Sequence, residues 1–308
     1  MSDPYRRLAA RLGEEAQLDA RLAPFTAIGI GGRAALLVIP RRRESLVRLL
    51  GEVREAGLPL YFFGGLTNVL LPDEGLRGVV MLNRVRGHRF DGTVLRVESG
   101  EMIAPLARRT ARHALEGLAW AVSVPGTIGG ALVGNAGAYG GEIGPLVEEA
   151  TLLSPQGEVV AVDGRWFDFA YRRSRLKGSG EGWTILSAVL RLRPAAREAV
   201  EAALNRYVEH RRRTQPRGRT LGSTFKNPPG DYAGRLIDAA GLKGLRRGGI
   251  VVSEKHANFF INEGGGTAAD YLALMREVQE RVMERFGLWL EPEIEIIDAA
   301  AEVAARGR

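Results

Sequence analysis

The sequence predicts an α+β fold with more than one domain. Apolar runs of strand length alternate with segments whose apolar residues recur at helical spacing, so strands and helices share the chain. Residues 147–163 form a predicted hairpin with Gln156-Gly157 at its turn, which argues against a purely parallel sheet. The 308 residues are enough for two or three domains of ordinary size. Strands mixed with helices indicate an α/β or α+β chain, and the hairpins favour α+β.

The elements expected before the hairpin follow from apolar periodicity and from glycine and proline stops. Helices are predicted over residues 4–20, 43–57 and 103–115, and the last of these tolerates a proline near its first turn. Strands are predicted at 34–40, 58–63, 78–82 and 93–99. Residues 117–144 are too rich in glycine to pack throughout, so we expect a long functional loop with a small-residue helix inside it.

The elements expected after the hairpin suggest a domain boundary near Pro194. A strong strand at 183–194 ends at this proline, and a helix at 196–213 follows. Beyond it we expect helices at 232–241 and 267–287, and strands at 249–253, 257–262 and 291–298. Residues 299–308 are predicted to be a polar tail with no role in the core.

Composition excludes several classes of site and of protein. The chain has no cysteine, so disulfides, thiolate zinc sites, iron–sulfur clusters and a cysteine nucleophile are excluded. The four histidines have no partners at metal-ligand spacing, and no metal is predicted. No apolar run approaches the ~20 residues that span a bilayer, and the N-terminus has no apolar signal core. We therefore expect a cytoplasmic protein with no membrane insertion.

The formal net charge of +7 comes almost entirely from arginine. Arginine suits bidentate recognition of phosphate and carboxylate, so the excess fits an anionic small ligand. A coding bias toward arginine explains the surface residues equally well. The chain lacks the aromatic and basic motifs of nucleic-acid readers, so no nucleic-acid partner is predicted, although a non-catalytic nucleotide- or RNA-binding protein is the alternative from another class.

Two glycine-rich segments are candidates for binding a phosphate. "GGLTN" (64–68) directly follows a predicted strand, where backbone amides can point at a pyrophosphate. "SVPGTIGGALVGNAGAYG" (123–140) removes side chains where a flat or charged group must approach closely. An ordinary turn or a flexible loop is the structural alternative, but interleaved Ile, Leu, Val and Tyr favour ligand binding in the second segment.

"LGSTFKNPPG" (221–230) presents hydroxyls on a turn without a local base. Ser223 is compatible with a turn residue, a phosphate ligand, a nucleophile or an acid, and spacing does not separate it from Thr224. The G-x-S-x-G pattern of a nucleophile elbow is absent. In "LWLEPEIEIID" (288–298), Glu291, Glu293 and Glu295 share one face of a predicted strand, and periodicity does not select among them.

Nine motifs in order give the chain a family resemblance over about residues 22–298. They are "IGIGGRA", "GGLTN", "SVPGTIGGALVGNAGAYG", "YRRSR", "RRTQP", "GSTFKNP", "AGRLIDAAGLKG", "VVSEKHANFFIN" and "LEPE". Together the motifs resemble those of the UDP-N-acetylenolpyruvoylglucosamine reductases, flavoenzymes that complete the UDP-N-acetylmuramate precursor of peptidoglycan. An enzyme of cell-wall synthesis, in a bacterial cytoplasm, is what the resemblance implies.

The resemblance implies a domain organisation. An N-terminal helix (1–21) would precede an FAD-binding domain (22–195) of the vanillyl-alcohol-oxidase, or PCMH, type, with lobes at about 22–75 and 76–195. A substrate-binding domain (196–298) and the tail (299–308) would follow.

The resemblance also implies non-covalent FAD, held by the two glycine-rich segments. The residues carried over as cofactor-binding are Gly64, Gly65, Thr67, Asn68, Ser123, Pro125, Gly126, Thr127, Gly129, Gly130, Asn135 and Gly137. One departure is Leu66, which stands where the family usually has the last glycine of G-x-G-S-N, with Thr67 in place of the serine.

The implied chemistry is hydride transfer from NADPH to the flavin, and from there to the terminal carbon of an enolpyruvyl ether. Arg172 matches the arginine that stabilises the resulting enolate, Glu293 the catalytic glutamate, and Ser223 the proton donor.

Tyr171, Lys226 and Asn227 match substrate-contacting or supporting positions. The chain lacks the extra tyrosine loop of some members, so it resembles the shorter class, and arginines 211–213 are candidates to hold the substrate diphosphate. The enzyme alternative is another FAD-dependent oxidoreductase with the same flavin fold.

Overall fold

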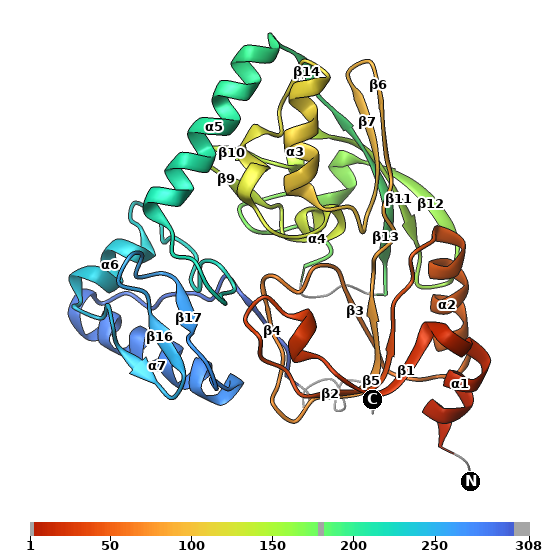
Figure 1. Cartoon of the computed structure of the whole chain (residues 1–308), viewed down its shortest axis with the longest axis horizontal. Helices are drawn as coiled ribbons and strands as arrows, with labels where there is room; N and C mark the ends of the chain where they lie inside the picture. The colour runs from red at the N-terminus through yellow and green to blue at the C-terminus, as the bar shows by residue number, and fades with distance from the viewer. Residues whose placement is uncertain (1–2, 178–181, 299–308) are drawn as a thin grey trace. The chain divides into compact units, whose positions relative to one another are not determined.

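A computed structural model describes residues 3–177 and 182–298 (Figure 1). The predicted tail at 299–308 lies outside the described residues. The chain forms two compact units. The first contains the described parts of Met1–Gln17, Leu37–Gly65 and Val79–Arg211, and the second those of Leu18–Leu36, Leu66–Gly78 and Arg212–Arg308. This division into compact units does not test the bounds of the predicted FAD-binding and substrate-binding domains, so those bounds stay predictions.

A five-stranded antiparallel sheet forms the centre of the first unit (Figure 1). Its order is β12-β11-β13-β7-β6, with bounds Val159–Asp163, Val147–Leu153, Thr184–Arg191, Val94–Glu98 and His88–Asp91. The predicted hairpin at 147–163 is confirmed as the β11–β12 pair. Helices α3 (Ile103–Arg112) and α4 (Ile128–Val133) bury their apolar residues with those of β7 and β13 in one core. The small-residue helix predicted inside the glycine-rich segment is therefore α4.

A second sheet has the order β1-β2-β5-β3, with bounds Ala16–Arg21, Arg33–Val38, Leu76–Leu82 and Leu60–Phe63. β3 and β5 are parallel, with Phe63 opposite Leu82, so the residues that follow these two strands emerge at the same sheet edge. The connecting helix α2 (Arg43–Glu55) was expected at 43–57 and buries Leu46, Leu49, Leu50 and Val53.

The helix predicted over residues 4–20 is wrong beyond its first half. α1 (Pro4–Leu12) is capped by the Asp3 side chain and ends at Gly13, whose φ of 60° is in the left-handed region that favours glycine. After a short 3-10 turn the chain becomes strand β1, in which Ala20 is buried. The sequence pattern does not reveal this change, because the polar residues of an exposed strand also fit the polar face of a helix.

The second unit is built around helix α7 (Ala268–Phe286), close to the predicted 267–287. Thr267 and Asp270 form a capping box at its start, and Gly287 ends it with a φ of 67°. Its apolar face packs with α6 (Ala233–Ala239) and a sheet of order β15-β16-β17. These strands span Arg246–Arg247, Ile250–Val252 and Phe260–Asn262.

The remaining elements are short, apart from helix α5 (Arg197–Thr214). β18 (Glu295–Ile296) pairs in parallel with β4 (Val69–Leu70), so the strand predicted at 291–298 is regular only at its centre. Two further pairs join β8 (Leu115–Glu116) to β14 (Arg193–Pro194), and β9 (Gly137–Ala138) to β10 (Gly141–Glu142) in the glycine-rich segment. No helix among residues 3–177 and 182–298 is long and apolar enough to cross a bilayer.

Candidate flavin and catalytic site

The two glycine-rich segments meet in the first unit at Gly64 and Thr127. A Cβ atom added to Gly64 would lie 2.2 Å from Thr127 Oγ1, far inside contact distance. Thr127 is the N-cap of α4, where its Oγ1 accepts a hydrogen bond from Gly130 N at 3.3 Å. Only glycine fits at position 64, because the Thr127 side chain lies directly against its backbone, and the two glycine-rich segments form a cradle there. This cradle fits the close approach of a phosphate-bearing cofactor.

The path of the second glycine-rich segment is fixed by backbone hydrogen bonds. Gly126 O accepts from Ile103 N at 3.1 Å, and Gly129 N donates to Ser99 O at 2.8 Å. Gly126 has a φ of 125°, which only glycine adopts without strain. Ser123 closes the 3-10 turn Ala119–Ser123 that leads into Pro125, so these predicted cofactor residues follow one continuous, anchored path.

The side-chain amide of Asn135 forms hydrogen bonds within the protein. Its Nδ2 donates to Glu142 Oε2 and to Ala170 O, both at 3.0 Å, and its Oδ1 accepts from Gly144 N at 3.0 Å. The residue is 1% exposed. Asn135 was predicted to bind the cofactor, and that role stays a prediction. In the structure its amide has three protein partners, which join the glycine-rich segment to the chain just before Tyr171.

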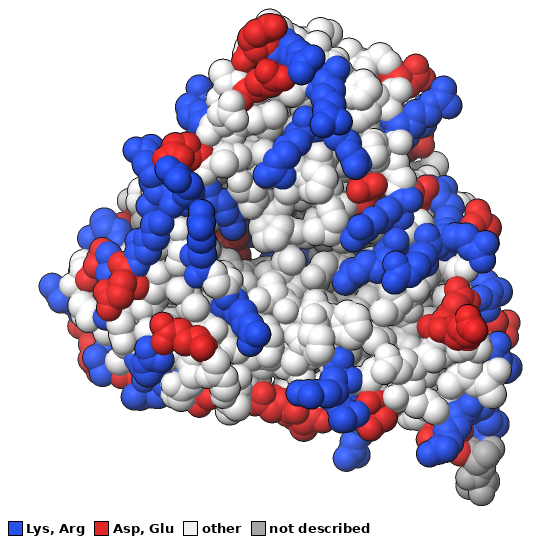
Figure 2. All heavy atoms as spheres, viewed as in Figure 1, with Lys and Arg blue, Asp and Glu red and all other residues white. Residues whose placement is uncertain are grey.

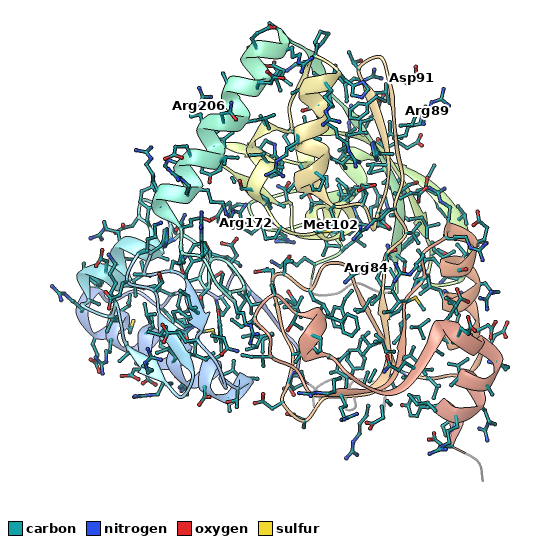
Figure 3. The ribbon with its side chains drawn as sticks, viewed as in Figure 1. Arg84, Arg89, Asp91, Met102, Arg172 and Arg206 are labelled. Carbon is teal, nitrogen blue, oxygen red and sulfur yellow. The ribbon has the colours of Figure 1, made fainter. Side chains whose placement is uncertain are left out.

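Arg172 lies against the same glycine-rich segment (Figure 3). Its Nη2 donates to Gly137 O at 2.9 Å, and its guanidinium carbon lies 5.0 Å from the centre of the Tyr171 ring. Ser174 Oγ donates to Val133 O at 2.7 Å, which fixes the following turn. Arg172 has a φ of 55°, a left-handed conformation that is uncommon outside glycine. The segment "YRRSR" is thus hydrogen-bonded to residues 133–137 of the first unit.

The end of the first glycine-rich segment belongs to the second unit. Leu66 has a φ of 51° and is 2% exposed, so its backbone adopts the conformation that glycine would favour while its side chain is buried. Ala27 N donates to Leu66 O at 3.0 Å. Asn68 Nδ2 donates to Glu293 O at 3.1 Å, and Asn68 O accepts from Glu295 N at 2.8 Å. Asn68 therefore holds the segment that carries a predicted catalytic residue.

Ser223 and Thr224 have different surroundings within the second unit. Thr224 is fully buried, and its Oγ1 shares a hydrogen bond of 2.9 Å with Tyr271 OH. Burial raises the pKa of Tyr271. Ser223 is only partly buried and forms an antiparallel bridge with Phe259. The hydroxyl of Ser223 is therefore not enclosed in the core that holds Thr224.

The segment that carries Ser223 lies between two others. On one side Thr224 N donates to Asn258 O at 2.8 Å, and on the other Glu293 N donates to Thr224 O at 2.8 Å. The structure thus brings two predicted catalytic residues, Ser223 and Glu293, onto adjacent segments. Arg172, the third, is in the first unit.

Lys226 and Asn227, predicted to contact substrate, both have protein partners. Lys226 Nζ donates to Glu291 Oε2 at 3.0 Å in an exposed ion pair of the kind that contributes little to stability. Asn227 Oδ1 accepts from Ala233 N at 3.1 Å and so caps the start of α6. Of the arginines 211–213, Arg211 has its pKa lowered by burial, and Arg212 O accepts from Lys255 Nζ at 2.6 Å.

Sequence reasoning did not select several residues that shape these segments. Arg84 Nη1 donates to Gly64 O at 2.6 Å, although the two residues are far apart in sequence. Only the parallel pairing of β3 with β5 brings them together. Asn258, in "ANFFIN", exchanges two hydrogen bonds with the backbone of Phe225, at 2.9 and 2.8 Å. The Tyr139 ring stacks on Tyr207 of α5 at 4.8 Å, which anchors the far end of the glycine-rich segment.

The surface charge is mixed rather than concentrated. Figure 2 shows Lys and Arg spread over the visible face with Asp and Glu among them. Many arginines are paired with carboxylates, as in Arg43–Glu98 at 2.7 Å and Arg191–Glu148 at 2.7 Å. Within residues 3–177 and 182–298, no group of three or more His, Asp and Glu side chains is placed to hold a metal ion.

The fold and the glycine cradle define a flavoprotein. A family model described as an FAD binding domain matches residues 34–163, which contain both glycine-rich segments. Together with the α+β architecture, the match makes this chain an FAD-binding protein of the vanillyl-alcohol-oxidase, or PCMH, type.

Known relatives then give the family. The model of the UDP-N-acetylenolpyruvoylglucosamine reductase C-terminal domain matches residues 214–297. A relative of that name from Symbiobacterium thermophilum is 45% identical, covering 89% of this chain and 90% of its own. One from Rubrobacter xylanophilus is 43% identical over 93% of this chain and 97% of its own. The crystal structure of UDP-N-acetylenolpyruvylglucosamine reductase from Thermus caldophilus has 32% identity and a TM-score of 0.79, covering 92% of this chain and 98% of that one.

The chain belongs to the UDP-N-acetylenolpyruvoylglucosamine reductase family and is an FAD-dependent oxidoreductase. The predicted family, fold and flavin cofactor are confirmed. The alternative of a non-catalytic nucleotide- or RNA-binding protein is wrong, because the relatives and the family models make this chain an oxidoreductase.

Proposed function

We propose that this protein reduces the enolpyruvyl group of UDP-N-acetyl-3-O-(1-carboxyvinyl)-glucosamine to UDP-N-acetylmuramate, with NADPH as hydride donor. This reaction is a step in the cytoplasmic synthesis of peptidoglycan precursors, on which cell shape and cell division depend. The observation that carries the proposal is the placement of Ser223 and Glu293 on adjacent segments joined by the Glu293 N–Thr224 O hydrogen bond, while the Thr224 side chain is buried. These segments belong to the part of the chain that matches the family's C-terminal domain.

The reaction adds a hydride and a proton across one carbon–carbon double bond. Bound FAD supplies the ring that carries the hydride from nicotinamide to the terminal carbon of the enolpyruvyl group. The double-bond electrons then reside on the neighbouring carbon and its carboxylate as an enolate. That carbon takes up a proton, and NADPH ends as NADP⁺, so atoms and electrons balance.

Ser223 is proposed as the donor of this proton. A serine hydroxyl is a weak acid, but an enolate is strongly basic, and a donor held in position needs no local base to act. Its partial exposure supports the role, because a hydroxyl that must give up a proton cannot be enclosed in the core. Glu293 is proposed as the second catalytic group of the same segment pair, assisting proton transfer.

Arg172 is proposed to stabilise the enolate through its guanidinium. A charge-assisted hydrogen bond to a developing anion is stronger in the transition state than in the ground state, which is the requirement for catalysis. The Gly137 carbonyl and the Tyr171 ring hold the guanidinium in place, which supports this role.

The substrate-contacting roles of Tyr171, Lys226 and Asn227 also remain proposals. Tyr171 is 52% exposed, which suits contact with a ligand. Asn227 has a structural partner in Ala233, so its carbonyl oxygen is already engaged. Arginines 211–213 remain candidates for the substrate diphosphate.

The proposal is tested by following the two added hydrogens in heavy water. Purified protein is incubated in D₂O with NADPH and the UDP-enolpyruvyl sugar, and the product is analysed by mass spectrometry and proton NMR. The expected product has one solvent deuterium on the carbon that bears the carboxylate. The hydrogen added to the neighbouring methyl group is deuterium to the extent that the N–H of the reduced flavin exchanges with solvent before transfer. Oxidation of NADPH without conversion of the sugar would overturn the proposal and favour another FAD-dependent oxidoreductase of the same fold.

A further inference from the structure

Both glycine-rich segments of the flavin site are fastened to the residues that follow strand β5. Asn83 N donates to Phe63 O at 2.8 Å, and Arg84 N donates to Pro40 O at 3.0 Å. The Arg84 side chain then reaches the first glycine-rich segment, where Nη1 donates to Gly64 O at 2.6 Å. Figure 3 labels Arg84, so its side chain can be followed there.

The second glycine-rich segment is tied to the same place. Asn83 Nδ2 donates to Ser99 Oγ at 2.8 Å, and Ser99 O accepts from Gly129 N at 2.8 Å. Gly64 itself abuts Thr127, as its added Cβ shows. Arg84 is therefore a cation placed beside the cradle that the two segments form within the first unit.

Arg84 has no carboxylate partner among residues 3–177 and 182–298. Its side-chain hydrogen bonds go to the carbonyls of Gly64 and of Asn83, and these neutral groups do not balance its charge. Burial lowers the pKa of Arg84, and the nearby cations Arg86 and Arg41 lower it further. By contrast, Arg43 of the same unit is paired with Glu98 at 2.7 Å. A partly buried cation without a counter-ion is unfavourable, and a bound anion would relieve this.

We propose that Arg84 is a cofactor-binding residue that provides the counter-charge for the diphosphate of FAD. The diphosphate is the anionic part of the cofactor, and it is the part that glycine-rich backbone accommodates. Arginine presents several N–H donors in a fixed plane, so Nη1 can hold the Gly64 carbonyl while the remaining donors face a phosphate. The interaction explains why a cation lies at this point of the cradle.

Arg84 could instead act only by holding the Gly64 carbonyl, and a comparison of two flavins separates these roles. FAD and riboflavin share the ring system, but riboflavin has no phosphate. Full-length protein is freed of flavin, and the dissociation constant of each is measured by flavin fluorescence for the wild type and for Arg84→Met. The matched control is Arg86→Met, which removes the same charge from an exposed neighbour.

We expect Arg84→Met to weaken FAD binding by roughly 10- to 100-fold, the loss of a charge-assisted pair, and riboflavin binding by less than about 3-fold. Arg86→Met should change either affinity by less than about 3-fold, as suits an exposed charge. Equal weakening of both flavins by Arg84→Met, or unchanged FAD affinity, would overturn the proposal.

A second variant keeps the test decisive if Arg84→Met does not fold. Arg84→Lys keeps the charge and loses the planar fork, so its FAD affinity should fall by a smaller factor and its riboflavin affinity should remain. Higher salt should weaken FAD binding to the wild type more than riboflavin binding, because only FAD has phosphate charges to screen. An equal salt response for both flavins would count against a phosphate contact.

Discussion

Thr224 and Tyr271 share a buried hydrogen bond of 2.9 Å between their hydroxyl groups, which commits Thr224 to the core of the second unit. The neighbouring Ser223 is only partly buried. Two hydroxyl residues that are equivalent in the sequence thus have different surroundings, and their replacements should have different effects.

We predict that Thr224→Val costs stability and Ser223→Ala costs catalysis. Thr224→Val leaves Tyr271 OH unpaired in the core, which should cost about 1–3 kcal/mol in urea unfolding. Ser223→Ala should change stability by less than about 0.5 kcal/mol. Loss of a general acid should slow reoxidation of reduced flavin by the UDP sugar by about 10²–10⁴-fold, with flavin reduction by NADPH unchanged. An equal loss of both half-reactions in Ser223→Ala would contradict the proton-donor role.

Asn135→Ala should destabilise the first unit more than it weakens flavin binding. The substitution leaves the Gly144 amide without its partner and removes one of the two hydrogen bonds to the Ala170 carbonyl, a loss of about 1–3 kcal/mol in the free energy of unfolding. The FAD dissociation constant of the folded variant should change by less than about 3-fold, because both N–H donors of the amide already have protein partners. A large loss of FAD affinity without loss of stability would show that Asn135 contacts the cofactor directly.

At position 66, glycine should destabilise the protein less than alanine does, which reverses the usual order of these two residues. Leu66→Ala loses the buried side chain but keeps the left-handed strain, whereas Leu66→Gly loses the side chain and removes the strain. Both variants should be less stable than the wild type, by about 1–5 kcal/mol, and the glycine variant should be the more stable of the two by about 1 kcal/mol. Alanine above glycine in a urea titration would show that the backbone at Leu66 is not left-handed.

His256 should make the protein lose stability as the pH falls. Burial lowers the pKa of His256 from its ordinary 6.5, so the unfolded chain takes up this proton at a higher pH than the folded protein does. The stabilising contribution is complete above the unfolded pKa of 6.5 and is lost as pH falls through the lower pKa of the folded protein. His256→Gln should flatten the pH dependence of the unfolding midpoint over this range. Identical pH profiles for His256→Gln and the wild type would contradict this account.

Local patterns predicted most elements because burial and stop signals agree. α7 begins and ends within a residue of its predicted bounds, since the Thr267 cap and Gly287 reinforce the apolar periodicity. The same reasoning failed for residues 4–20, because Gly13 ends the helix while the pattern of polar residues continues beyond it. Periodicity detects which residues face solvent but does not detect a change from helix to strand along an exposed edge.

The site was predictable where a motif is contiguous and not where it depends on pairing in space. The glycine-rich segments are visible in the sequence, but the contact between Gly64 and Thr127 that explains a glycine is not. Asn135 lies inside such a motif and its flavin contact stays a prediction, but its protein partners Glu142, Ala170 and Gly144 are not visible in the motif. Arg84 reaches Gly64 only through the parallel register of β3 and β5, which no local pattern encodes.

The visible absorption spectrum of the flavin, followed without oxygen, tests the proposed function most directly. The purified protein should be yellow, NADPH should bleach it, and the UDP-enolpyruvyl sugar should then restore the oxidised spectrum with formation of one product molecule for each flavin. A bleached flavin that the sugar leaves unchanged, while oxygen restores its colour, would contradict the proposed substrate and identify a different FAD-dependent oxidoreductase.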